Sequence, residues 1–344
     1  MQGSMHEDED DIWLQRPALA DRATRQAGGL SCQAIELDPG GTNPAECLFG
    51  ATDATAKGRV VALLDPARIF GLPEILEASG LHHVSLFQHG TDDSTPILVQ
   101  LLPEARLTRQ LLDGRDRPTS LLHAKAGIYF RTSMGMTGLR RHLRRLMRVS
   151  DDQGQVYFFR FWEPWAAQCY FEQIKDMPQR ALHWFHTVEG ESLGDVLVPD
   201  PEAGRMMVFG ASFGNAARPH VPFRLAAVEY QALQHARLRA DLRQIVGLIR
   251  KTFPDVAEKL GHARLERDVT RSVRRMQDFG IRQRDNLLRL AAWDLHSEGR
   301  LEGRDAQGLL RAILENSMPE TQKMLALTER IAELDQTASP GRLA

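Results

Sequence analysis

Short apolar runs alternate with helix-length amphipathic segments through the first two thirds of this chain, and that alternation is the strongest constraint on its fold. Runs such as VVALLD (60–65) and AGIYFRTS (126–133) are rich in β-branched and aromatic residues and have the length of buried strands. Between such runs, segments such as TGLRRHLRRLMR (137–148) repeat apolar residues at helical spacing. Strands that alternate with helices predict an α/β domain over residues 58–215, a mixed, layered sheet with flanking helices.

The pattern after Pro222 is helical almost throughout. One apolar stripe there repeats at helical spacing and consists of Leu238, Leu242, Ile245, Val246 and Ile249. Further on, the segment 264–280 ends in Gly280, a residue typical of helix C-caps. We therefore predict an all-helical C-terminal domain over residues 223–335, followed by a tail at 336–344.

The remaining stretches are rich in turn-forming residues. Residues 1–57 combine an acidic run with glycine- and proline-containing turns, so we expect a flexible or partly ordered segment with SCQAIEL (31–37) as a candidate edge strand. Residues 190–222 contain several prolines, and within them only RMMVFGAS (205–212) has the pattern of a strand.

Composition excludes several classes of protein. The formal net charge of the 344 residues is -2, which gives no overall attraction to nucleic acid or to acidic membranes. No apolar run is long enough to span a bilayer, and the acidic start lacks the features of a secretory signal, so we expect a cytoplasmic protein. The three cysteines are widely spaced, and the histidine pair His183 and His186 lacks a third ligand at a familiar spacing. We therefore expect no metal and no cofactor.

Five arginines lie on the face of segment 137–148 opposite its leucines. They are Arg140, Arg141, Arg144, Arg145 and Arg148. Such a face can bind an acidic protein partner, bind phosphates, or be solvated with local salt bridges. No aromatic residues are interleaved with these arginines, which disfavours single-stranded nucleic acid as the ligand.

The stretch VYFFRFWEPW (156–165) is the densest aromatic run of the chain and carries one arginine in its middle. The period of two over QVYFFRFW (155–162) predicts a central strand that is covered on both faces, followed by a helix from Pro164. A buried Arg160 needs an acceptor, and Asp65, at the exit of an earlier strand, is the predicted partner in a structural ion pair. Trp162 and Trp165, near the end of the strand, are candidates for a partner-binding rim, together with the arginine helix.

An enzymatic alternative rests on GASFG (210–214), which matches the G-x-S-x-G pattern of hydrolases. In that alternative Ser212 is the nucleophile and His220 or His235 the base. A nucleophile elbow requires a helix directly after the serine, whereas here NAARPHVPF follows, with two prolines. The sequence therefore favours a non-catalytic protein and keeps the serine hydrolase as the alternative.

Several blocks, in this order, resemble the type VI secretion effector-adaptor family, the Tap- or Tec-type chaperones encoded beside VgrG spike and effector genes. The blocks are VVALLDPA (60–67), SLF (85–87), TPILVQL (95–101), GLRRHLRRLMRV (138–149) and QVYFFRFWEP (155–164). The resemblance covers about residues 58–185. Two departures are Glu163, where the family usually has Asp, and Pro66, where it usually has a small residue. Glutamate keeps the charge, so a role in an ion pair is retained.

The resemblance implies an adaptor with no enzymatic activity. Such a protein binds one cognate effector toxin in the cytoplasm and helps to load it onto the VgrG spike. Its partners are then the effector and VgrG, with no nucleic acid and no insertion into a membrane. An adaptor of this kind is expected to have an exposed apolar patch that accepts a segment of its client.

Overall fold

The computed structural model describes most of the chain in two compact units, Met1–Leu233 and Gln234–Ala344. The described residues are 29–37, 44–50, 58–87, 95–114, 120–151, 153–211, 213–214, 223–297 and 299–338. Much of the segment 1–57 and the end of the tail therefore lie outside the described residues. Each unit is considered by itself.

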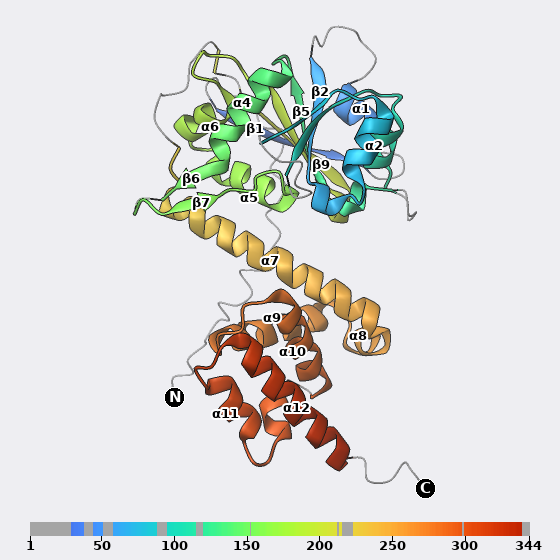
Figure 1. Cartoon of the computed structure of the whole chain (residues 1–344), viewed down its shortest axis with the longest axis vertical. Coiled ribbons are helices and arrows are strands. Elements are labelled where there is room, and N and C mark those ends of the chain that lie inside the picture. The colour runs from blue at the N-terminus through green and yellow to red at the C-terminus, as the bar shows by residue number, and fades with distance from the viewer. Residues whose placement is uncertain are drawn as a thin grey trace, which may run out of the picture. The chain divides into compact units, whose positions relative to one another are not determined.

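A seven-stranded sheet forms the centre of the first unit, in the order β1-β9-β8-β5-β2-β4-β3 (Figure 1). All neighbouring strands pair antiparallel. The strands are β1 (Leu30–Glu36), β2 (Arg59–Leu64), β3 (His83–Ser85), β4 (Ile97–Leu101), β5 (Gly127–Thr132), β8 (Asp195–Asp200) and β9 (Arg205–Ala211). A separate two-stranded sheet pairs β6 (Arg148–Ser150) with β7 (Val156–Phe158).

Helices cover both faces of the large sheet, because its central strands are apolar on both sides. Along β2, Val61 and Leu63 belong to one core cluster, and Ala62 and Leu64 belong to the other. The first cluster packs against α4 (Met136–Met147), α5 (Pro164–Ile174) and α6 (Pro178–Phe185). The second packs against α1 (Pro44–Phe49), α2 (Leu72–Ser79) and α3 (Arg106–Leu112). Short 3₁₀ turns lie at Pro66–Arg68, Leu122–Ala124 and Pro201–Ala203. The predicted α/β layered sheet with flanking helices is confirmed.

The structure differs from the expected strands at two places. Strand β8 was not expected, because residues 190–222 have the composition of turns, yet it lies between β9 and β5. Pro199 is tolerated because β5 pairs only with Asp195–Leu197, so the β5 side of β8 is unpaired at the proline. The expected central strand at 155–162 was wrong: only Val156–Phe158 is a strand, and it belongs to the small sheet.

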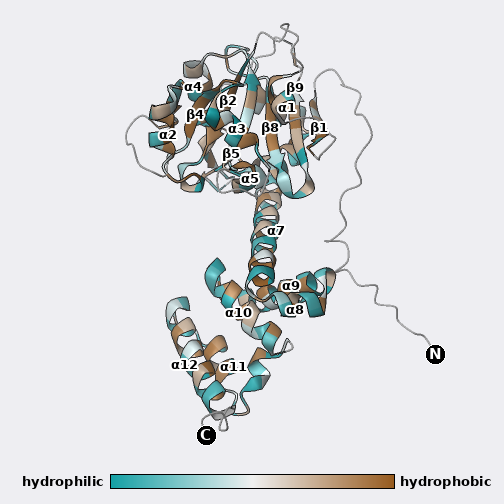
Figure 2. Cartoon of the chain, turned by 90° about the vertical axis from the view of Figure 1, so that its right-hand side faces the viewer, coloured by the Kyte–Doolittle hydropathy of each residue, from teal (hydrophilic) through white to brown (hydrophobic). Residues whose placement is uncertain are grey.

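The second unit is all-helical, as predicted for the C-terminal region (Figure 2). Helix α7 (Ala227–Thr252) begins in the first unit and contributes Leu242, Ile245, Val246 and Ile249 to the core of the second. The other helices are α8 (Pro254–Leu260), α9 (His262–Asp278), α10 (Arg284–His296), the 3₁₀ turn Leu301–Arg304, α11 (Leu309–Glu315) and α12 (Glu320–Ala338).

A buried lysine satisfies carbonyl groups at the ends of two helices in this second unit. Lys323 is buried, and its Nζ donates to the carbonyl oxygens of Phe279 (2.6 Å) and Leu314 (2.8 Å), at the ends of α9 and α11. A cation at a helix C-terminus satisfies unpaired carbonyls and complements the helix dipole. Gly280, with φ +84°, ends α9 as predicted, and its N–H donates to the carbonyl of Gln277.

Candidate partner-binding surface

Helix α4 separates an apolar face from a basic one. Leu139, Leu143 and Leu146 are fully buried in the first core cluster. The intervening arginines lie only one or two positions from the nearest leucine, and such neighbours project from other sides of a helix with 3.6 residues per turn, so the arginines point away from that core. Burial of the leucine face therefore fixes the direction of the arginines.

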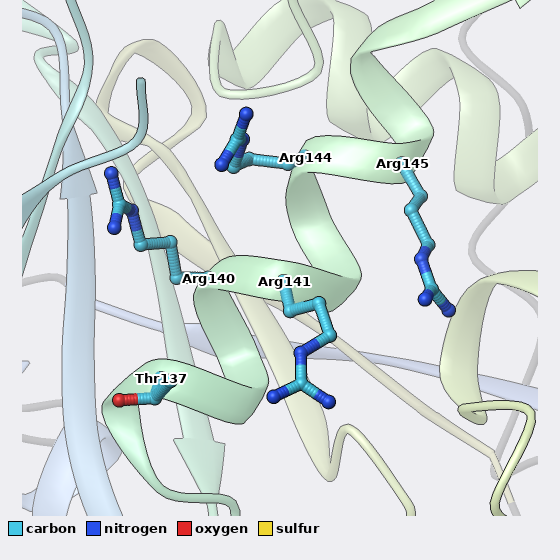
Figure 3. A pocket seen from close by; sticks show the side chains of 5 residues that line it. All are labelled: Thr137, Arg140, Arg141, Arg144 and Arg145. Carbon is cyan, nitrogen blue, oxygen red and sulfur yellow. The ribbon is translucent and has the colours of Figure 1, made fainter. Parts of the chain in front are cut away.

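Four of the five arginines surround one surface hollow. It has a volume of about 450 Å³ and is lined by Thr137, Arg140, Arg141, Arg144 and Arg145. Figure 3 shows Arg140 and Arg144 on one flank of the helix and Arg141 and Arg145 on the other. Four guanidinium groups around one hollow favour a ligand that carries several carboxylates or phosphates.

Contacts hold parts of this surface in place. Arg140 donates through Nη2 to the carbonyl oxygen of Phe87, at 2.6 Å. On the other flank, the pKa of Glu189 is lowered, chiefly by a hydrogen bond with its own backbone and by Thr187, and also by the nearby charges of Arg145 and Arg141. Glu189 therefore remains ionised beside these arginines at neutral pH.

The fifth arginine, Arg148, follows α4 directly and begins strand β6. It lies opposite Phe158 in the hairpin that β6 forms with β7. Asp151 stabilises the connection: its carboxylate accepts from the N–H groups of Gln153 and Gln155 and from the hydroxyl of Tyr157. Although desolvation alone raises the pKa of Asp151, these hydrogen bonds lower it below its usual value.

Helix α4 and the hairpin lie within one recognised segment. Residues 61–181 match the family model described as "Domain of unknown function (DUF4123)". No match was found among curated proteins, and none among solved structures. The DUF4123 segment contains all the arginines and tryptophans predicted as a partner surface, and also Asp65 and Arg160.

In the DUF4123 segment, Arg160 joins two parts of the fold through its guanidinium group. Its Nη2 lies 2.7 Å from Asp65 Oδ2, and its Nε lies 2.6 Å from Glu163 Oε1. Asp65 also accepts from the N–H of Ala67, so the same carboxylate caps the 3₁₀ turn after β2. Arg160 is half exposed, which the expected central strand did not allow for. The ion pair therefore ties the exit of β2 to the turn before α5.

The two tryptophans of this stretch differ in exposure. Trp162 is only 2% exposed, and its Nε1 donates to Asp65 Oδ2 at 3.4 Å. Its ring is therefore not available to a partner in this structure, because residues 159–163 form a turn that directs it into the core. Trp165 is half-buried and donates to Glu163 at 2.6 Å. Of the two tryptophans of the predicted rim, only Trp165 retains accessible surface.

Replacing Asp65 by asparagine tests the Arg160 network. The amide oxygen can still cap Ala67, but the amide nitrogen then faces two donors, Arg160 Nη2 and Trp162 Nε1. We expect a loss of about 2 kcal/mol in the free energy of unfolding, because Trp162 is buried whereas Arg160 can turn to water. Chemical denaturation measures this loss. The control is Asp200→Asn, which alters an ion pair with Arg205 at the end of β8. Equal losses of stability in the two variants contradict the assignment of Asp65 as the shared acceptor of Arg160 and Trp162.

Three accessible residues of this surface escaped the sequence analysis. Val156 and Phe158 are 59% and 49% exposed, and Phe158 stacks on the half-buried Phe87 at 5.9 Å. Their aromatic and β-branched character predicted burial in a central strand. The sequence did allow another interpretation. A run with apolar residues on both faces and an arginine in its middle is also compatible with a short hairpin strand.

The hydrolase alternative rests on three residues, of which the structure describes one. Ser212 and His220 lie outside the described residues, and His235 is exposed on α7. Strand β9 ends at Ala211, and the next described helix begins at Ala227. Within the described ranges, no group of three or more His, Cys, Asp or Glu side chains is arranged to hold a metal ion. A search of the same ranges found no helix that is both long and apolar enough to cross a membrane.

Proposed function

We propose that this chain is a non-catalytic adaptor that binds a cognate type VI secretion effector in the cytoplasm and helps to load it onto the VgrG spike. The observation that carries the proposal is the match of residues 61–181 to DUF4123, a family associated with effector adaptors of this secretion system. The sequence blocks described above lie in the same segment, and their order supports the same conclusion.

The arginine surface of α4 is the proposed docking surface for the effector. Interfaces between proteins are enriched in arginine, and complementary charge directs association and excludes wrong partners. The four-arginine hollow fits an effector segment rich in aspartate and glutamate. A helix that presents its charges in fixed rows also offers a more rigid surface than a loop does.

Co-expression with the toxin encoded by the adjacent gene tests the proposal. We expect the two proteins to co-purify, and the VgrG protein of the same cluster to join the complex. The double substitution Arg141→Glu and Arg145→Glu is expected to weaken toxin binding by about tenfold or more, because two attractive contacts become repulsive. Binding measured at several salt concentrations should show that the weakened variant has lost most of its salt dependence.

The matched control is Arg264→Glu with Arg271→Glu, the same change in charge on two exposed arginines of α9. This control is expected to leave binding unchanged. Failure of the toxin to co-purify contradicts the adaptor function. Co-purification that is insensitive to Arg141 and Arg145 retains the function and refutes the docking surface.

A further inference from the structure

Strand β7 has an outer edge that no other strand of the described residues covers. Hydrogen bonds join Phe159 N to Met147 O (2.7 Å) and Asp151 N to Gln155 O (3.0 Å), at the two ends of the β6–β7 ladder. Hydrogen-bonded and non-hydrogen-bonded pairs alternate in an antiparallel ladder, so the pairs that contain Val156 and Phe158 are non-hydrogen-bonded. The backbone N–H and C=O groups of these two residues therefore point away from β6.

The two edges of the hairpin differ. On the β6 side, the carbonyl oxygen of Ser150 accepts from the N–H of Leu225 at 2.8 Å, so that edge is covered. On the β7 side, no backbone group of the described residues bonds to the outward groups of Val156 or Phe158, and the Val156 carbonyl accepts only a long, exposed contact of 3.5 Å from its neighbour Gln155 Nε2. Both residues are half exposed or more, as the position of β7 at the margin of the first unit also indicates (Figure 1). Unpaired strand edges are templates for another strand.

The side chains along this edge have the character of a binding surface. One face of the hairpin carries Val156, Phe158 and Arg148. Val156 and Phe158 are two positions apart in β7 and so share a face, and Arg148 lies directly opposite Phe158 on the same face. Phe158 stacks on Phe87 and meets the edge of the buried Trp162 ring at 5.7 Å. An aromatic residue that packs on other rings, remains partly exposed and lies beside an arginine is typical of interface hot spots.

Charge decides the kind of occupant. Arg148 lies directly opposite Phe158, and the guanidinium group of Arg140 is bonded to the carbonyl of Phe87, so both cations adjoin the aromatic residues. A second copy of the chain would bring the same cations to this edge, so it offers no complementary acidic partner for Arg140 and Arg148. A strand that alternates apolar and acidic side chains instead matches both the apolar and the basic parts of the surface.

We propose that β7 binds an extended, acidic and apolar segment of the effector as an added third strand of the hairpin sheet. The inference rests on the proposed adaptor function and specifies how the client is held. Main-chain hydrogen bonds to Val156 and Phe158 supply part of the affinity, and contacts with the side chains of Phe158 and Arg148 select the side chains of the bound segment. The added strand also covers apolar surface that is otherwise exposed to water.

Substitution of Val156 by proline removes the outward N–H group while keeping an apolar side chain. Proline is tolerated at the first residue of a strand, and the hydrogen bonds within the hairpin do not use this donor. The matched control, Val156→Ala, retains the donor and shortens the side chain. We expect proline to weaken binding of the co-expressed toxin by about tenfold or more and alanine to weaken it much less.

Hydrogen exchange on the wild-type complex tests the same point without a substitution. The amides of Val156 and Phe158 are expected to exchange at least about tenfold more slowly when the toxin is bound, whereas the amide of Tyr157, already inside the hairpin, is expected to change little. A complex without this protection, or with full affinity for the proline variant, overturns the added strand and leaves the adaptor function standing. Absence of any complex overturns both.

Discussion

Replacing Trp184 by alanine is expected to produce the largest loss of stability in the first unit, about 3–5 kcal/mol in the free energy of unfolding. The side chain is fully buried on α6. Its ring centroid lies 5.0–6.3 Å from those of five aromatic residues: Phe159, Phe161, Tyr170, Phe171 and Phe223. Alanine leaves a cavity among rings that cannot collapse into it, because each is held by its own neighbours.

Guanidinium denaturation followed by fluorescence measures this loss. The chain has two units, so two transitions are possible, and only the transition of the first unit should move. The matched control is Trp184→Phe, which retains a ring and is expected to cost much less. An alanine variant as stable as the wild type contradicts the assignment of Trp184 as the centre of the aromatic core.

Glu229 is the second residue whose loss is expected to be severe. Its side chain is fully buried at the start of α7 and accepts from three donors: Tyr170 Oη at 3.1 Å, Ala226 N at 2.6 Å and Arg180 Nη2, in an ion pair of 3.3 Å. Burial and then the adjacent Glu229 charge raise the pKa of Tyr170 well above its usual value, so the tyrosine stays protonated and donates.

Substitution of Glu229 by alanine is expected to cost about 3–5 kcal/mol, because the buried tyrosine hydroxyl and one helix N–H lose their acceptor and Arg180 loses its counter-charge. Glutamine serves as the control, since its amide oxygen can still accept from one of these donors. Thermal unfolding of both variants measures the difference. Equal stability of the alanine and glutamine variants contradicts the three-donor arrangement.

The spacing of apolar residues along the chain was sufficient to predict much of the fold. The leucine stripe of α4, the helical texture after Pro222 and the buried runs of β2 and β5 each follow from periodicity, and the structure contains each of them. The antiparallel strand order was beyond the sequence, because pairing depends on contacts between segments far apart in the chain. Strand β8 was missed because its proline and its turn-rich flanks masked a short apolar run.

The stretch VYFFRFWEPW was the most instructive misreading. Strict alternation of faces would have placed Phe161 and Trp162 on opposite sides of a sheet, yet both are buried, and their rings meet edge to face at 5.6 Å. The chain therefore turns after Phe158, and Arg160 is held outside by Asp65 and Glu163. Tertiary packing of the aromatic residues decided this. The partnership of Arg160 with Asp65 was expected from the cost of burying the arginine, whereas the charge that is buried in the structure is that of Asp65.

Anchoring of α7 by Glu229 has a practical consequence for cutting the protein into pieces. Tyr230 packs on Tyr157 of the hairpin, and Leu233 belongs to the first core cluster, so the first turns of this helix are part of the first unit. A shortened gene product that stops near Pro222 would lack these residues and leave Tyr170 and Arg180 without their carboxylate. Fragments intended for crystallisation or interaction screens should therefore extend beyond Leu233.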